Sequence, residues 1–130
     1  MGQRYILDTN TVIDYYGDKL PPDSALALDK LVNDELNISI IVRIEALGFN
    51  GEESEMQDLK DLLSLAKIFY VDDLVADKTI DLRKMYRKLK LGDAIIAATA
   101  LVNNLTLISR NTKDFEDISG LTCTNPYDLK

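Results

Sequence analysis

Short apolar runs alternate with longer helical segments along this chain, and this alternation constrains the fold more than any other feature of the sequence. Each strand-like run is rich in β-branched residues, and the segment after it carries apolar side chains at helical spacing. Two parallel strands need a long crossover connection, which is usually a helix. We therefore expect an α/β fold with a mostly parallel central sheet and helices on both faces.

The pattern also gives approximate bounds for each element. The expected strands cover residues 4–7, 36–40, 68–71 and 106–109, with a short last strand at 123–125. The expected helices cover residues 11–18, 21–34, 41–49, 52–67, 72–90 and 92–104. Thr9 or Asn10 is the expected cap of the first helix, and Asp72 or Asp73 is the expected cap of the helix over 72–90. The whole chain, residues 1–130, has the length of one domain.

Composition restricts the chemistry that the chain can perform. It has no histidine, so a metal site has to use oxygen ligands, which favours Mg²⁺ or Mn²⁺ over Zn²⁺. Its single cysteine cannot form an intramolecular disulfide, and its first ten residues lack the layout of a signal peptide, so we expect a cytoplasmic protein with no membrane contact. The net charge of −7 argues against a large nucleic-acid surface, unless bound cations offset a cluster of acids.

Four carboxylates stand at positions that the helix and strand pattern alone does not explain. Asp8 and Asp114 follow strands, and sites in α/β sheets form beyond the carboxyl ends of strands. Asp93 heads a helix that is apolar nearly all round, which predicts burial. Glu45 lies in the apolar segment 38–49, where a buried carboxylate needs a cation or must stay neutral. Taken singly, the acids could be helix caps, an ion-pair partner and a turn residue.

Taken together, these four acids predict a metal site. Four carboxylates at close range repel one another, and a divalent cation removes that conflict. The reaction that needs such a site is the attack of water on a phosphodiester. There the metal lowers the pKa of the attacking water and offsets charge on the leaving oxygen. This chemistry needs no histidine base.

Four motifs of the chain resemble those of the PIN domain family, and most closely those of its VapC-type ribonuclease toxins from bacterial toxin–antitoxin pairs. The motifs are YILDTNTVID, IEALGF, LGDAIIAATAL and LISRNTKDF. They occur in the family's order and spacing and span the chain nearly from end to end. The resemblance implies a compact α/β/α sandwich that binds Mg²⁺ or Mn²⁺ and cleaves RNA.

The resemblance also implies roles for individual residues and for partners. It assigns catalytic and metal-binding roles to Asp8, Glu45, Asp93 and Asp114. It assigns supporting polar roles to Asn10, Ser109 and Asn111. It implies a homodimer that is silenced by a cognate antitoxin protein whose tail crosses the active site.

Basic residues stand close in sequence to the predicted acids. They are Arg43, Arg87, Lys88, Lys90, Arg110 and Lys113. Positive charge beside a metal site could hold the phosphates on either side of the cut RNA bond. The cations before Asp93 could equally be a solvated helix face that suits the helix C-terminus.

Other α/β classes fit these residues less well. A phosphatase of the haloacid dehalogenase type needs a second Asp two residues after the first, and that position is Asn10. A receiver domain needs an acidic pair after the first strand, and a nucleotide-binding switch needs a P-loop; the sequence has neither. A catalytically silent PIN fold that only binds protein is the remaining alternative. The sequence therefore favours a metal-dependent endoribonuclease.

Overall fold

The computed structural model of the chain describes residues 2–130, and strands alternate with helices as the sequence predicts. The strands are β1 (Tyr5–Leu7), β2 (Asn37–Ser39), β3 (Lys67–Phe69), β4 (Thr106–Ile108) and β5 (Cys123–Thr124). The helices are α1 (Thr9–Tyr16), α2 (Pro22–Asp34), α3 (Ile40–Leu47), α4 (Glu53–Leu63), α5 (Asp73–Met85), α6 (Leu91–Val102) and α7 (Thr112–Phe115), followed by the 3₁₀ turn η1 (Pro126–Asp128).

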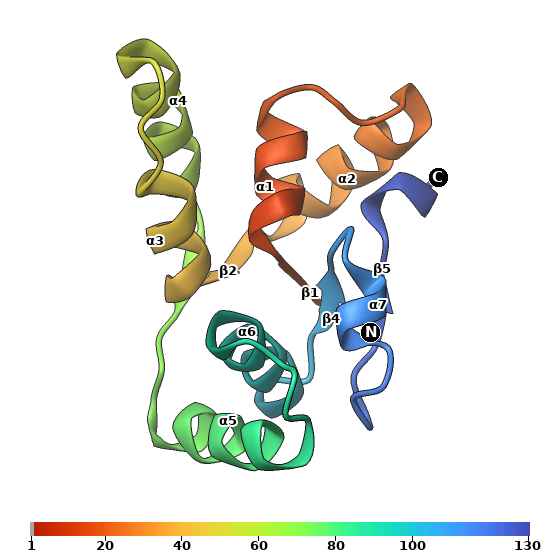
Figure 1. Cartoon of the computed structure of the whole chain (residues 1–130). Coiled ribbons are helices and arrows are strands. Elements are labelled where there is room, and N and C mark those ends of the chain that lie inside the picture. The colour runs from red at the N-terminus through yellow and green to blue at the C-terminus, as the bar shows by residue number, and fades with distance from the viewer. Residues whose placement is uncertain (1) are drawn as a thin grey trace.

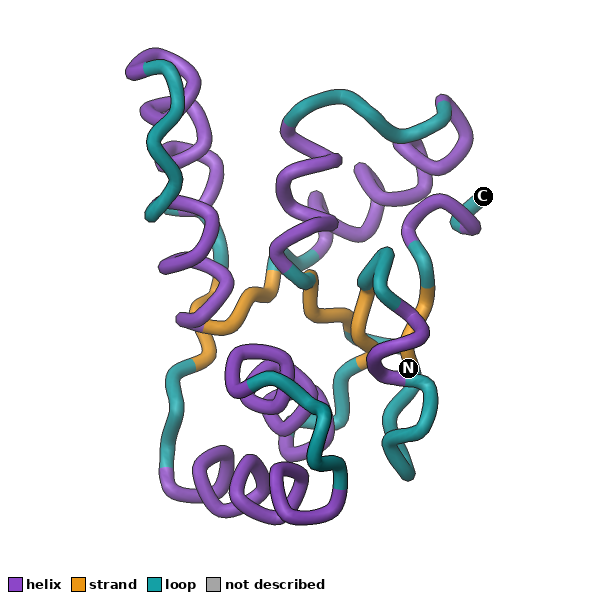
Figure 2. Tube along the Cα trace, viewed as in Figure 1, coloured by secondary structure: helices purple, strands orange, loops and turns teal. Residues whose placement is uncertain are grey.

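The strands form two parallel ladders that lie side by side. β1 pairs with β4, β4 pairs with β5, and β2 pairs with β3, each in parallel. Strand β2 lies beside β1, so the spatial order is β3–β2–β1–β4–β5. Helices α1 and α2 lie on one side of the strands, and α5 and α6 lie on the other (Figures 1 and 2). The predicted α/β fold with a parallel central sheet between helices is confirmed.

A single buried side chain connects the two ladders. Asn37 is fully buried, and its Nδ2 donates to the Tyr5 carbonyl oxygen at 2.8 Å and to Glu35 Oε1 at 2.6 Å. The first of these bonds reaches from β2 to the backbone of β1. It satisfies a carbonyl at the seam where the strand ladders adjoin.

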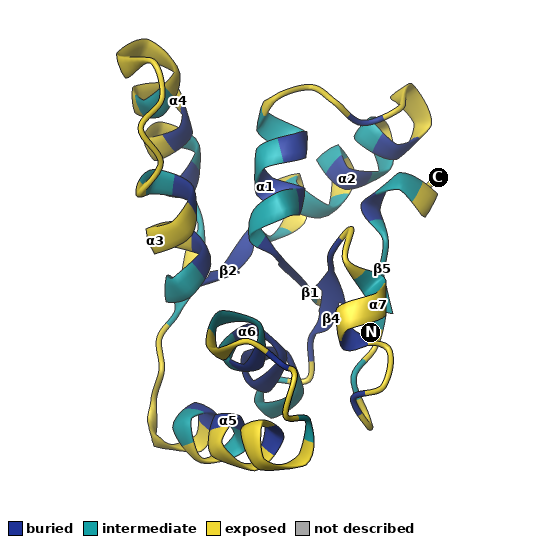
Figure 3. Cartoon of the chain, viewed as in Figure 1, coloured by how far each residue is buried: buried dark blue, intermediate teal, exposed yellow. Residues whose placement is uncertain are grey.

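Helix α6 is the most buried helix of the fold, as its apolar sequence predicts. Ala94 and every residue from 96 to 100 are buried (Figure 3). The helix packs on α5 and also contacts β2 and β4. Its one buried hydroxyl, Thr99 Oγ1, donates to the Ile95 carbonyl at 2.7 Å, so this hydroxyl does not oppose the burial.

The predicted element ends differ from the structure by the most at the C-terminal ends of two helices. The helix predicted over 72–90 ends at Met85, and residues 86–90 form a loop. The helix predicted over 52–67 ends at Leu63, and β3 begins at Lys67, one residue before the predicted strand.

The predicted cap of the first helix is wrong, because α1 begins at Thr9 and its cap is Asp8. The second predicted cap is confirmed, since Asp72 Oδ1 accepts the Val75 N–H at 2.9 Å. Within residues 2–130, none of the helices has the length and apolar character needed to cross a bilayer.

We expect Asn37→Ala to lower the free energy of unfolding by about 2 kcal/mol, because it leaves the Tyr5 carbonyl without its partner at the seam between the ladders. Urea denaturation followed by circular dichroism measures the change. Asn33→Ala, at an exposed position of α2, is the matched control and should change stability by less than about 0.5 kcal/mol. Equal stabilities for the two variants would contradict the bridging role of Asn37.

Candidate active site

Asp8 lies at the carboxyl end of β1, directly beside the carboxyl end of β4. It is 5% exposed, and its Oδ2 accepts a hydrogen bond of 2.7 Å from Ser109 Oγ. Its Oδ1 accepts the Thr9 N–H at 2.8 Å and so caps α1. One carboxylate oxygen therefore caps α1, and the other accepts a hydrogen bond from the residue that follows β4. The helix-cap interpretation of Asp8 is correct, but capping uses only one of the two carboxylate oxygens.

Asn10 ties the β1 end of the site to the segment after β4. Its Nδ2 lies 3.3 Å from both Asp8 Oδ2 and Ser109 Oγ, and its Oδ1 accepts the Arg110 N–H at 3.0 Å. Asn111 joins this network through its backbone, because its N–H donates to Ser109 Oγ at 3.1 Å. Asn111 itself is exposed. The three predicted supporting residues thus lie together around Asp8.

Glu45 is exposed, so the prediction that it lies on a buried helix is wrong. Helix α3 buries only part of its apolar surface, and Ile44 is 59% exposed. The Glu45 carboxylate nevertheless lies at the site. Its Oε1 accepts a 2.7 Å hydrogen bond from Thr9 Oγ1. Its Oε2 lies close to Gly92, since a Cβ atom at that position would be 3.7 Å from it. Glu45 therefore lies between the start of α1 and the first turn of α6.

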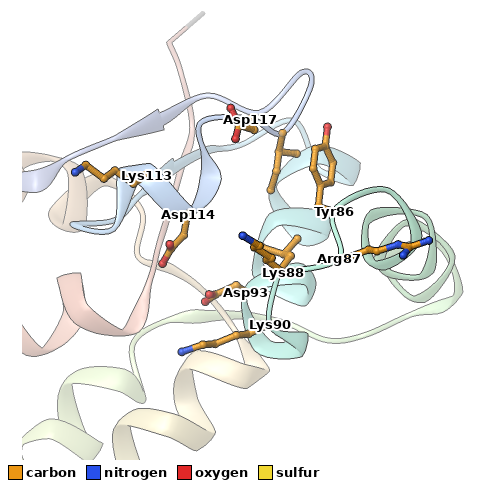
Figure 4. Close-up of a pocket in the computed structure, with 10 residues that line it drawn as sticks. Tyr86, Arg87, Lys88, Lys90, Asp93, Lys113, Asp114 and Asp117 are labelled. Carbon is orange, nitrogen blue, oxygen red and sulfur yellow. The ribbon is translucent and has the colours of Figure 1, made fainter.

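Asp93 and Asp114 approach the site from the other side. Asp93 is the third residue of α6, the cap position is Lys90, and no side-chain cap bond forms there, so the helix-cap interpretation of Asp93 is wrong. Asp114 is exposed on the short helix α7, where the sequence suggested only a polar loop. In Figure 4 the two carboxylates turn toward each other between α6 and α7.

The charges of these acids act on one another. Burial raises the pKa of Asp8, and the charges of Glu45 and Asp114 raise it further, against the hydrogen bonds from Ser109 and Thr9. Burial likewise raises the pKa of Asp93 to about 6, with further contributions from Asp8, Asp114 and Glu45 and an opposing one from Lys90. The site thus concentrates negative charge that the protein's own cations only partly offset.

The acids line two pockets that meet at Asp93. The acidic pocket, of about 380 Å³, is lined by Asp8, Glu45 and Asp93 together with Asn10, Thr9 and Asn111. The basic pocket, of about 430 Å³, has Asp93, Asp114 and Asp117 beside Tyr86, Arg87, Lys88, Lys90, Lys113 and Ile118. Within residues 2–130, no three acidic or cysteine side chains lie close enough together to surround one metal ion. The donors are oxygens of the type that Mg²⁺ and Mn²⁺ prefer, but they are spread over the two pockets.

The predicted RNA-binding cations other than Arg110 fall into three groups. Lys88 and Lys90 flank the acids in the basic pocket, whereas Arg87 and Lys113 line its edge with their charged ends directed away from Asp93 (Figure 4). Arg43 lies apart from the acids, in a small pocket between α3 and α4.

Arg110 is occupied by a network that the sequence analysis did not identify. Its Nη1 donates to Asp14 Oδ2 at 2.8 Å, and Tyr127 Oη donates to the same oxygen at 3.0 Å. Asp14 is only 2% exposed. The only signal in the sequence was its spacing, because Asp14 follows Asn10 by four residues and so shares a helix face with it. The network fixes the segment that carries Ser109 to α1 and to the C-terminal turn.

Comparison with known proteins identifies the family of the chain. The PIN domain family matches residues 5–121 of the chain. Ribonuclease VapC1 of Methanocaldococcus jannaschii is 30% identical over 120 residues, which cover 87% of this chain and 79% of that protein.

Two solved structures are also similar to the chain. A toxin–antitoxin complex from Klebsiella pneumoniae contains a chain that is 32% identical, with a TM-score of 0.75 and coverage of 96% of this chain and 99% of the other. VapBC2 from Rickettsia felis, bound to a DNA fragment from its promoter, gives 25% identity, a TM-score of 0.80, and coverage of 95% and 98%. The chain belongs to the PIN domain family. Within that family it is of the VapC type.

We expect Asp93→Asn to stabilise the metal-free protein at pH 7.5. Between pH 3.8 and about 6, folded Asp93 holds a proton that the unfolded chain has released, so stability falls as pH rises through this window. Above this pH window, Asp93 is charged in the folded protein, and the charge lowers the stability of the fold. A shift of this size on a half-buried group corresponds to about 1 kcal/mol after allowance for solvent screening, or about 4 °C in Tm.

Thermal denaturation in EDTA at pH 7.5 and at pH 4 measures this effect. The Tm of Asp93→Asn should exceed the Tm of wild type clearly at pH 7.5 and only slightly at pH 4. Asp77→Asn, which removes an exposed carboxylate of α5, is the control and should leave Tm nearly unchanged at both. A lower Tm for Asp93→Asn at pH 7.5 would contradict the conclusion that burial and the neighbouring acids make the charged side chain unfavourable.

Proposed function

We propose that the protein is a metal-dependent endoribonuclease, the toxin of a toxin–antitoxin pair, with Asp8, Glu45, Asp93 and Asp114 as catalytic and metal-binding residues. The observation that carries the proposal is the convergence of these four carboxylates on two adjoining pockets. They come from four separate segments, yet burial raises the pKa values of Asp8 and Asp93, and the charges of the other acids raise them further. A protein rarely keeps such repulsion unless a function needs it.

The relatives support the same reaction. Ribonuclease VapC1 of Methanocaldococcus jannaschii is named for cleavage of RNA, and 87% of this chain aligns with it. The Klebsiella pneumoniae structure is named as a toxin–antitoxin complex. We infer from these names that RNA is the substrate of this chain and that an antitoxin protein is its partner.

The donor set of the site fits Mg²⁺ or Mn²⁺. The acidic and basic pockets offer carboxylate oxygens from all four acids, with an amide oxygen from Asn10 near them. The chain contains no histidine, so the site has none of the imidazole ligands common at Zn²⁺ sites. When bound, the metal ion would lower the pKa of the attacking water and offset the charge that develops on the phosphate.

The residues of the chain would then divide the remaining work. Ser109 and Asn10 hold Asp8 in one orientation through their hydrogen bonds, so that its free edge faces the acidic pocket. Thr9 holds Glu45 in the same way. Lys88 and Lys90, beside the acids, would bind the phosphates that flank the cut bond.

Cleavage of RNA by the purified, antitoxin-free protein tests the proposal. Total RNA is incubated with Mn²⁺, with Mg²⁺ or with EDTA. We expect discrete fragments with either metal and none with EDTA. Asp93→Asn should lower the rate by at least about 100-fold, because loss of a group that stabilises transition-state charge has effects of this size.

Asp77→Asn is again the matched control, since it removes the same charge from an exposed position of α5 and should cleave like wild type. Intact RNA under all conditions with folded wild-type protein would refute the nuclease. The catalytically silent protein-binding module would then be the better interpretation.

We also propose that the chain forms a homodimer and binds its antitoxin through apolar surface that the isolated chain leaves uncovered. Helix α3 and the turn after it expose Ile44 and Phe49, and Phe49 is 69% exposed. Exposed apolar residues grouped on one helix are typical of a binding surface.

Light scattering during gel filtration tests the assembly. We expect twice the 14.6 kDa mass of the chain for the protein alone, and a larger complex after co-expression with a candidate antitoxin, sought as a small protein encoded directly upstream. The complex should cleave RNA more slowly than the free protein. A monomer whose RNA cleavage the upstream protein leaves unchanged would refute this part of the proposal.

A further inference from the structure

We propose that Asn50 loses its side-chain amide spontaneously, through attack by the backbone nitrogen of Gly51, and becomes aspartate or isoaspartate. The two residues lie in the turn between α3 and α4, outside the acidic and basic pockets. Asn50 is the only asparagine of the chain that precedes a glycine. The reaction needs neither RNA nor a metal ion, so the inference is independent of the proposed function.

The reaction transfers no electrons to or from another molecule and requires only water. The Gly51 nitrogen gives up its proton and forms a bond to the side-chain carbonyl carbon of Asn50. The bond from that carbon to the amide nitrogen breaks, and the amide nitrogen takes up the proton and departs as ammonia. A five-membered succinimide ring remains, and water opens it at one of its two carbonyl carbons. One opening gives aspartate. The other gives isoaspartate, in which the main chain runs through the former side chain. Asparagine is among the chemically labile residues of proteins.

The turn between α3 and α4 leaves both reacting groups open to water. Asn50 and Gly51 are exposed, and neither belongs to a helix or a strand (Figure 3). The Gly51 N–H donates to the Phe49 carbonyl at 3.2 Å, which is the long end of the range for such bonds. Because the turn is exposed, water can replace this hydrogen bond when the nitrogen loses its proton. The fold therefore does little to protect the pair.

Packing explains why a glycine follows Asn50. A Cβ atom at position 51 would lie 2.9 Å from Met56 Sδ and 3.5 Å from Phe49 Cδ1. Met56, in the first turn of α4, packs against the hydrophobic core, so its approach to the backbone of the turn favours a residue without a side chain. The same lack of a side chain lets the Gly51 nitrogen reach the side-chain carbonyl carbon of Asn50 without steric hindrance. The packing of the turn thus preserves a reactive pair.

The other exposed asparagines of the described chain lack this combination. Asn33 lies within α2, where the next backbone nitrogen is part of the helical hydrogen-bond pattern. Asn104 precedes buried Leu105, whose N–H is hydrogen-bonded within the fold at 2.8 Å. Asn111 precedes Thr112, whose β-branched side chain hinders the approach of its nitrogen. We therefore expect the modification at the turn between α3 and α4 alone.

The product changes the surface at the start of α4. Loss of the amide adds a carboxylate just before Glu52 and Glu53, and it takes the net charge of the chain from −7 to −8. A negative charge next to a helix N-terminus is favourable, so the fold should persist. Isoaspartate also adds a carbon atom to the main chain beside Phe49, which is 69% exposed. The modification therefore alters the charge and the shape of this apolar turn as the protein ages.

Peptide mass spectrometry of the folded protein tests the inference. The protein is incubated in EDTA at pH 7.5 and at pH 8.5, and it is then digested at acidic pH, where the reaction is slow. The peptide that contains Asn50 should gain the mass that corresponds to exchange of NH₂ for OH, whereas the peptide that contains Asn33 should not. The rate should rise about tenfold from pH 7.5 to pH 8.5, because the reactive form is the deprotonated Gly51 nitrogen.

The product and two variants identify the mechanism. Isoaspartate should be present and separable from aspartate by chromatography, because only opening of the ring produces it. Gly51→Ala keeps Asn50 but should convert at least about tenfold more slowly, since a Cβ atom restricts the backbone and hinders the attack. Asn50→Asp should elute from an anion-exchange column together with the aspartate form of aged wild type. Circular dichroism checks that each variant is folded.

The inference is overturned if Asn50 of the folded protein stays intact at pH 8.5 over the time in which a synthetic peptide of residues 46–55 converts. The fold would then hold the two reacting groups apart. It is also overturned if aspartate is the only product, or if Asn33 converts as fast as Asn50. Equal rates for Gly51→Ala and wild type would overturn it as well. Each of these outcomes leaves the proposed nuclease standing, because cleavage of RNA is measured separately.

Discussion

The hydrogen bond from Ser109 to Asp8 is the contact on which the arrangement of the site depends. It joins residues that are 101 positions apart, at the carboxyl ends of two paired parallel strands. The same carboxylate caps α1, so the direction of that helix and the register of β1 against β4 are fixed at one point. A buried carboxylate with a raised pKa is unfavourable for folding. The fold retains this carboxylate because the hydrogen bonds around it hold its charge in one position.

A second layer of buried polar groups supports this point. Arg110 follows Ser109 and pairs with buried Asp14, which also accepts a hydrogen bond from Tyr127. The C-terminal turn is in turn anchored to α2, because Ser24 Oγ donates to the carbonyls of Tyr127 and Leu129. Segments from the beginning and the end of the chain thus restrain the same short stretch after β4. A site that holds like charges close together needs such a rigid frame, because a loose one would let the charges move apart.

The sequence predicts the fold class and the four acids, but it fails where the answer depends on distant residues. The alternation of strands and helices is local, and so is the apolar character of α6, so both were predictable. Glu45 was predicted to be buried because apolar residues surround it in sequence, yet α3 leaves part of its apolar surface open. The end of α5 was missed because the burial of Leu89 and its bond from Arg83 appear only in the folded chain. The pairing of Arg110 with Asp14 was invisible for the same reason.

The four acids stand on four different parts of the chain, and this has a consequence for how the protein is made. Asp8 precedes α1, Glu45 is on α3, Asp93 is on α6, and Asp114 is on α7, so the four acids are translated far apart in time. Ribosomes deliver a protein from its N-terminus. An unfinished chain therefore carries only part of the acidic cluster, and β1 has no β4 beside it to hold Asp8. The cluster is complete only when the chain has left the ribosome beyond Asp114 and folded.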